Sequence, residues 1–243
     1  MQPAEMLAQL AADGRALRDA ATDLDAPVPP CPGWTVHDAV EHTAMVYAHK
    51  SEVLETGAFE EGEWPPPGLV YDDVIEFYDE QLHRLIENLR TRDPLAHAGS
   101  WYEPDQTVGF WVRRMMQETV VHRADVESAF GAPTCVRDEV AIDGIDEVIE
   151  RFLSFDTWSY PKDLGTGQRI AVRAGDSAWT VTLTPERAAF TRSAADGADA
   201  MIDGPPSDVL LALWNRMPYD AVHTDGVTEA LAALKAALAA CTQ

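Results

Sequence analysis

Apolar residues recur at steps of three and four along most of the first 160 residues, which is the spacing of one face of an α-helix. The segment 70–91 shows this clearly, with apolar positions at Val74, Phe77, Tyr78, Leu82, Leu85 and Leu89. The pattern predicts five helices, at residues 4–24, 35–56, 70–91, 108–130 and 138–157. Helices of about 20 residues with short or proline-rich connections favour an up-and-down bundle.

Several predicted helix ends carry their own sequence signals. Thr35, followed three residues later by Asp38, resembles a capping box with aspartate in the acid position. Gly57 and Gly131 each follow the predicted end of a helix, where glycine can close it.

The pattern changes after residue 160. Residues 169–174 and 179–183 alternate with period two across the turn Gly175-Asp176, which predicts a β-hairpin. Further elements are expected as short strands at 189–192 and 200–203 and as helices at 208–216 and 227–240. We therefore predict an α+β chain with a helical bundle over residues 1–160 and a small α/β domain over residues 167–243.

The composition limits which partners and which cellular location can be expected. Of the 243 residues, 18 are Lys or Arg and 41 are Asp or Glu, which gives a formal net charge of −23. Such an acidic surface repels phosphate backbones and anionic lipid, so nucleic acid and membranes are poor partners.

The chain has an odd number of cysteines, and they form no CxxC motif, which argues against a disulfide framework. The three cysteines are Cys31, Cys135 and Cys241. With no signal-peptide pattern at the N-terminus, we expect a cytoplasmic protein.

Glu118 and His122 are the pair most suited to chemistry. Four residues apart on a helix, they lie on one face, in the same row as Trp111, Met115 and Val126. That row should point into the bundle. A buried carboxylate and imidazole cost several kcal/mol unless something satisfies them, and a divalent cation would do so.

His42 has a similar setting on the second predicted helix, in line with Ala39 and Val46. Two imidazoles and one carboxylate are the ligand count of a catalytic zinc site, with a position left for water or substrate. A helix-surface ion pair is the alternative for the Glu118 and His122 spacing. A further alternative is a buried, hydrogen-bonded triad without metal.

Three segments carry a family resemblance. Residues 31–42, CPGWTVHDAVEH, resemble the GW-[ST]-V-x-D-x-x-x-H opening of the second helix in the DinB-like mycothiol-dependent maleylpyruvate isomerase family. Residues 113–125, RRMMQETVVHRAD, resemble that family's R-x-x-x-x-E-x-x-x-H-R-x-D helix. Residues 199–216 resemble its C-terminal domain, including an L-x-L-W-x-R helix. Together the matches cover most of the chain in the correct order.

The resemblance implies a DinB-like four-helix bundle that holds a divalent metal, zinc foremost, on His42, Glu118 and His122, followed by a small α/β domain. It also implies mycothiol as a cosubstrate thiol and a small-molecule electrophile as substrate, in an isomerase or a thiol S-transferase. We expect a monomer or a small homo-oligomer.

The resemblance also directs attention to Arg216, because it suggests that the end of this helix faces the metal cleft. The guanidinium of Arg216 could bind a substrate carboxylate through two parallel hydrogen bonds, or it could neutralise the end of its own helix. The chain departs from the family pattern at Asn215, where a glycine is common, and this leaves the substrate open.

A second class of function stays open at this point. In a non-enzymatic binding module, the metal would be structural and the C-terminal domain would hold an apolar ligand. A coordination position open to solvent favours catalysis, whereas four protein ligands in a closed site favour a structural metal.

Overall fold

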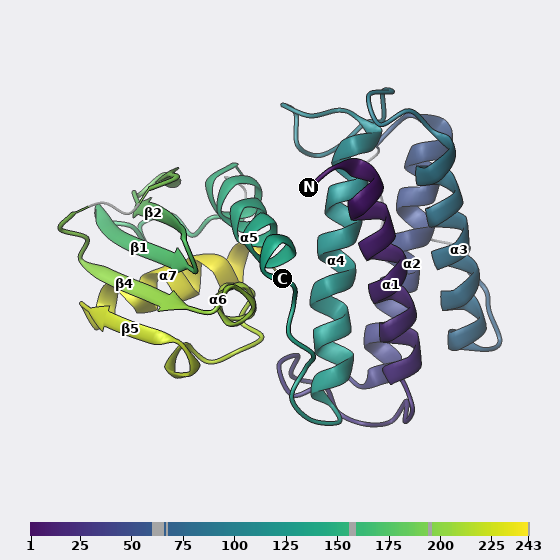
Figure 1. The fold of residues 1–243 in the computed structure, drawn as a ribbon, viewed down its shortest axis with the longest axis horizontal. Coiled ribbons are helices and arrows are strands. Elements are labelled where there is room, and N and C mark those ends of the chain that lie inside the picture. Colours follow the sequence, from purple (N-terminus) through teal and green to yellow (C-terminus); the bar gives the residue numbers. More distant parts are fainter. Residues whose placement is uncertain (60–65, 67, 156–158, 194–195, 243) are drawn as a thin grey trace. The chain divides into compact units, whose positions relative to one another are not determined.

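The computed structural model describes residues 1–59, 66, 68–155, 159–193 and 196–242. The chain divides into two compact units, Met1–Thr134 and Cys135–Gln243. Figure 1 shows helices throughout the first unit, and a sheet with helices in the second. The α+β class predicted from the sequence is confirmed.

The first unit is a bundle of the four long helices α1 Pro3–Ala20, α2 Val36–Thr56, α3 Val74–Thr91 and α4 Val108–Ser128. Helix α1 packs mainly against α4, and α2 packs mainly against α3. The apolar row of each helix lies in the core, where large side chains such as Tyr47, Tyr78 and Trp111 are fully buried. This burial supplies most of the stabilisation, since isolated helices of this length are marginal in water.

The start and the end of α2 are fixed locally, as the sequence predicts. The Asp38 carboxylate accepts a hydrogen bond from the Thr35 backbone N–H at 2.7 Å, while the Thr35 hydroxyl accepts one from the Asp38 N–H. Gly57 closes the helix with a left-handed φ of 76°. Because these contacts fix both ends of α2, they also fix the position of His42 along the helix.

The second unit combines a mixed sheet with helices. Its elements are α5 Asp138–Glu147, the π-helical turn η1 Val148–Phe155, β1 Gln168–Ala174, β2 Ser177–Leu183, β3 Ala188–Thr191, β4 Ala200–Gly204, α6 Pro206–Leu213, the 3-10 turn η2 Tyr219–Ala221, β5 His223–Gly226 and α7 Thr228–Cys241. The strand order is β3-β2-β1-β4-β5. Strands β1 and β4 are parallel, and the other neighbours are antiparallel.

The division between the units differs from the predicted boundary at 160–167. Helix α5 was expected in the bundle, but it packs against α6 and lies in the second unit. Its apolar face has the same period as the bundle helices, so periodicity alone could not assign it. The predicted helix 138–157 becomes π-helical from Val148, and its last two residues lie outside the described residues.

Two further details differ from the sequence prediction. Strand β5 was missed because its residues are polar and mostly exposed; it forms by pairing with β4. Helix α6 ends at Leu213 instead of residue 216, and Asn215 just beyond it adopts a left-handed φ of 57°. Among the described residues, no helix is both long enough and apolar enough to cross a membrane.

Candidate metal centre

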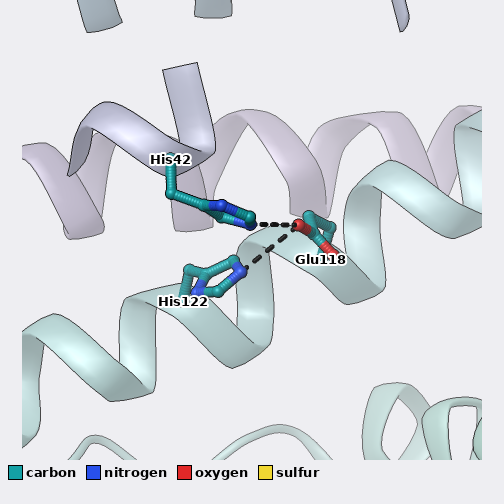
Figure 2. Close-up of side chains that lie close together, drawn as sticks. All are labelled: His42, Glu118 and His122. Atoms are coloured by element: carbon teal, nitrogen blue, oxygen red, sulfur yellow. Dashed lines mark ion pairs between the residues drawn. The ribbon is translucent and has the colours of Figure 1, made fainter. Parts of the chain in front are cut away.

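Two helices of the first unit bring the three predicted ligands together. His42 comes from α2, and Glu118 and His122 come from α4, one helical turn apart. Figure 2 shows both imidazoles directed at the same carboxylate. The Glu118 Oε1 atom lies 3.2 Å from His122 Nε2 and 3.6 Å from His42 Nε2. The sequence therefore predicted correctly that these side chains converge.

The cluster is buried on one side and reachable from solvent on the other. Exposed side-chain fractions are 7% for His122, 17% for Glu118 and 28% for His42. One potential ligand atom from each of these three residues lies within 4.8 Å of the other two. The arrangement matches a three-ligand site with an open side rather than a closed four-ligand site.

The electrostatics of the cluster favour the charged forms of both partners. Burial alone would raise the pKa of the Glu118 carboxyl. The charge and hydrogen bond of His122, the hydrogen bond of His42 and the charge of Arg114 outweigh burial and hold this pKa well below its usual range. Burial alone would lower the pKa of the His122 imidazole. Glu118 and Asp125 outweigh burial and raise this pKa to about 9.

Two buried residues on α4 fix the orientation of these ligands. His122 Nδ1 lies 3.0 Å from Asp125 Oδ2, which leaves Nε2 directed at Glu118. Arg114 donates to the second carboxylate oxygen of Glu118, Oε2, at 3.0 Å. A histidine that ligates a metal usually makes such a bond through its other ring nitrogen. The sequence prediction missed both roles, although each residue lies one helical turn or less from a ligand.

Trp34 covers the imidazoles from the segment that precedes α2. Its ring centroid lies 5.1 Å from that of His42 and 6.2 Å from that of His122, where the two rings are stacked. The indole ring therefore packs beside both imidazoles of the cluster.

The donor set fits a divalent metal. Two imidazole nitrogens and one carboxylate oxygen are ligands that zinc accepts. A cation in place of the Nε2 proton of His122 would contact the same three side chains. A second cluster, His37, Asp38 and Glu41, fits less well because Asp38 caps α2 and the Tyr71 hydroxyl donates to Glu41.

Arg216 lies in the second unit, three residues beyond the end of α6. Its Nη1 atom donates to the backbone carbonyl of Trp214 at 2.9 Å. This contact is of the kind expected from a cation that neutralises a helix end. Among the described residues, Cys31, Cys135 and Cys241 form no disulfide.

The first unit is a four-helix bundle with a His-Glu-His cluster on two of its helices, and a small α/β unit follows it in the chain. These features define a class of helical-bundle proteins with a candidate metal site. Residues 4–127 match the Mycothiol maleylpyruvate isomerase N-terminal domain, and residues 139–233 match the C-terminal domain of the same family. The chain belongs to the mycothiol maleylpyruvate isomerase family.

Two solved structures have the same fold. One is the mycothiol-dependent maleylpyruvate isomerase, with 12% identity and a TM-score of 0.66, and the other is a histidine-to-alanine mutant of mycothiol-dependent maleylpyruvate isomerase, with 11% identity and a TM-score of 0.65. Each alignment covers 94% of this chain and 96% of the other chain. No curated protein matches the sequence.

Proposed function

We propose that this protein is a metal-dependent enzyme that uses mycothiol as its nucleophile. The observation that carries the proposal is the convergence of His42, Glu118 and His122 at a site with one solvent-reachable side. Membership of the mycothiol maleylpyruvate isomerase family supports an enzyme and supports the thiol cosubstrate.

Each residue of the site has a definable role in this proposal. His42, Glu118 and His122 would hold the metal, zinc foremost. A bound divalent metal lowers the pKa of a coordinated thiol, so that thiolate is available at neutral pH without a strong base. Asp125 orients His122, and Arg114 holds the Glu118 carboxylate through Oε2.

The reaction that we favour is cis–trans isomerisation of an unsaturated acid. The thiolate adds to one carbon of the double bond, and the electron pair moves to the other carbon and its conjugated carbonyl. The resulting single bond rotates, and the thiolate leaves as the trans double bond forms, so that the thiol is regenerated. A thiol S-transferase shares the first step but keeps the carbon–sulfur bond.

We also propose a cytoplasmic location for this protein, because low-molecular-weight thiols are kept reduced there.

Elemental analysis of the His122→Ala variant tests the metal assignment. We expect about one divalent metal per wild-type chain and a loss of metal in the variant with an unchanged helical signal, because the bundle keeps its other apolar contacts. His83→Ala is a matched control, since His83 is an exposed histidine on α3 and should leave the metal content unchanged. Unchanged stoichiometry and affinity in His122→Ala would refute the assignment.

A turnover assay separates the enzyme from a binding module with a structural metal. The metal-loaded protein, mixed with mycothiol and a cis-unsaturated acid, should yield the trans acid, whereas a transferase yields the thioether. Absence of either product with a panel of electrophilic acids and epoxides would favour the binding module.

A further inference from the structure

Lys50 is a half-buried cation in an aromatic setting, on the same helix as His42 and two turns further along. Its Nζ atom lies 5.1 Å from the centroid of the Trp111 ring and 5.2 Å from that of Phe59. The same atom lies 3.0 Å from Nδ1 of His49. Eight residues of helix place Lys50 about 12 Å along α2 from His42.

The Lys50 ammonium forms no direct ion pair within the part of the chain that the structure describes. Among the described residues, no carboxylate lies within ion-pair distance of its Nζ, although the chain carries 41 acids against 18 Lys and Arg. Burial, together with the charge of Lys50, lowers the pKa of His49 to about 4, so the His49 ring is neutral and accepts the hydrogen bond. Among the described residues, this half-buried ammonium contacts two rings and a neutral imidazole, and it keeps capacity for an anion.

Lys50 belongs to the same electrostatic neighbourhood as the metal ligands. Burial lowers its pKa to about 8, while the charge of Glu118 acts against this effect and that of Arg114 adds to it. Its ring partner Trp111 lies on α4 in the row that leads to Glu118. The ammonium thus lies along the two helices that supply the ligands, and it remains largely protonated at neutral pH.

We propose that Lys50 binds a carboxylate of the acid substrate whose reacting carbon lies at the metal centre. This inference rests on the proposed function. The protein repels anions in general, so an acidic substrate needs a local cation within the first unit, and Lys50 supplies one. Lys50 is then a substrate-binding residue. A lysine that merely covers aromatic surface would leave the affinity for anions unchanged.

Calorimetric titration of the metal-loaded protein tests this proposal with maleate, a small cis-unsaturated dicarboxylate, and with its uncharged dimethyl ester. Lys50→Met keeps the apolar stem but removes the charge, and we expect it to weaken maleate binding at least about tenfold, as loss of a charge-assisted hydrogen bond does. Binding of the ester should not change. Lys50→Arg should restore maleate binding to within a few-fold of wild type.

Lys235→Met is the matched control, because Lys235 also lies over an aromatic ring, that of Tyr219 at 5.7 Å, but in the second unit. It should leave maleate affinity unchanged. Equal maleate affinity in Lys50→Met and wild type, an equal loss in Lys235→Met, or no maleate binding by the metal-loaded wild type would each overturn the proposal. A parallel loss of mycothiol affinity would assign Lys50 to the thiol and also overturn it.

Metal content keeps the two proposals distinguishable. Every variant at position 50 should retain about one metal per chain, because Lys50 provides no ligand. If the wild type binds no metal or has no thiol-dependent turnover, the proposed function fails. If metal and turnover are present and Lys50→Met binds maleate normally, the role of Lys50 alone fails.

Discussion

His122 and Asp125 are joined across one turn of α4, with 3.0 Å between His122 Nδ1 and Asp125 Oδ2. The Asp125 carboxylate is completely buried. The bond fixes which ring nitrogen faces inward and which faces Glu118, so that Nε2 is the atom presented to a metal. The orientation of the imidazole is therefore set before any ligand arrives.

Replacing Asp125 with Asn should weaken metal binding by about 10–100-fold, because an amide holds the His122 ring less firmly and makes it less basic. Competition with a chromogenic chelator measures this affinity, and circular dichroism checks that the variant is folded. Asp19→Asn, a change at an exposed aspartate of α1, should have no effect on affinity. A folded Asp125→Asn protein with wild-type affinity would show that this bond does not support the site.

Lys50 should make stability depend on pH. Its folded pKa of about 8 is below the ordinary 10.5, mainly because of burial, so the unfolded chain binds this proton more tightly. The cost of burying the charge is present below pH 8 and disappears as the pH rises toward 10.5. Lys50→Met should therefore raise the free energy of unfolding at pH 7 by about 2 kcal/mol, after loss of the ring contacts.

Urea denaturation at pH 7 and at pH 10 measures this difference between Lys50→Met and wild type. The gain should shrink at the higher pH, where wild-type Lys50 is mostly neutral. Among the described residues, the charged or titratable groups that act on Lys50 are His49, Arg114 and Glu118, and each is retained in the variant. A gain that is equal at both pH values would contradict the assigned cause.

Arg216→Lys should separate the two roles considered for Arg216. Lysine keeps a charge near the end of α6 but cannot make two parallel hydrogen bonds to a carboxylate. If Arg216 binds substrate, kcat/KM for an acidic substrate should fall at least about tenfold with little change in melting temperature. Arg187→Lys, at an exposed position of the second unit, is the control. Full activity toward the acidic substrate would leave Arg216 as a helix-end cation.

Asn215→Gly should stabilise the protein. Asn215 has a left-handed φ of 57°, which glycine adopts without strain. Its amide nitrogen and oxygen are both buried and have no hydrogen-bond partner among the described residues. Removing the unpaired amide should outweigh the greater chain entropy of glycine and raise the free energy of unfolding by about 1 kcal/mol.

Asp163→Gly is the matched comparison for thermal or urea unfolding, because Asp163 also has a left-handed φ, of 68°, but an exposed side chain. Both changes relieve the strain of a left-handed backbone conformation. The amount by which the free energy of unfolding rises more at position 215 than at position 163 therefore measures the contribution of the buried amide. If the stabilisation at position 215 does not exceed that at position 163, the buried amide of Asn215 does not destabilise the protein.

The sequence by itself determined the elements whose signals are local. The apolar rows placed the bundle helices and the hairpin, and Thr35 with Asp38 and Gly57 bounded α2, because capping and periodicity involve residues within a few positions of one another. The same rows placed Glu118, His122 and His42 on inward faces. Their assignment as metal ligands, and the role of Arg216, remain predictions.

Tertiary contacts decided what local patterns leave open. Helix α5 has a bundle-like period, but contact with α6 places it in the second unit, and β5 exists through its pairing with β4. The meeting of His42 with Glu118 and the position of Lys50 beside the Trp111 ring depend on how α2 packs against α4. Periodicity fixes which face of a helix is apolar, whereas the partner of that face depends on shape and burial over the whole unit.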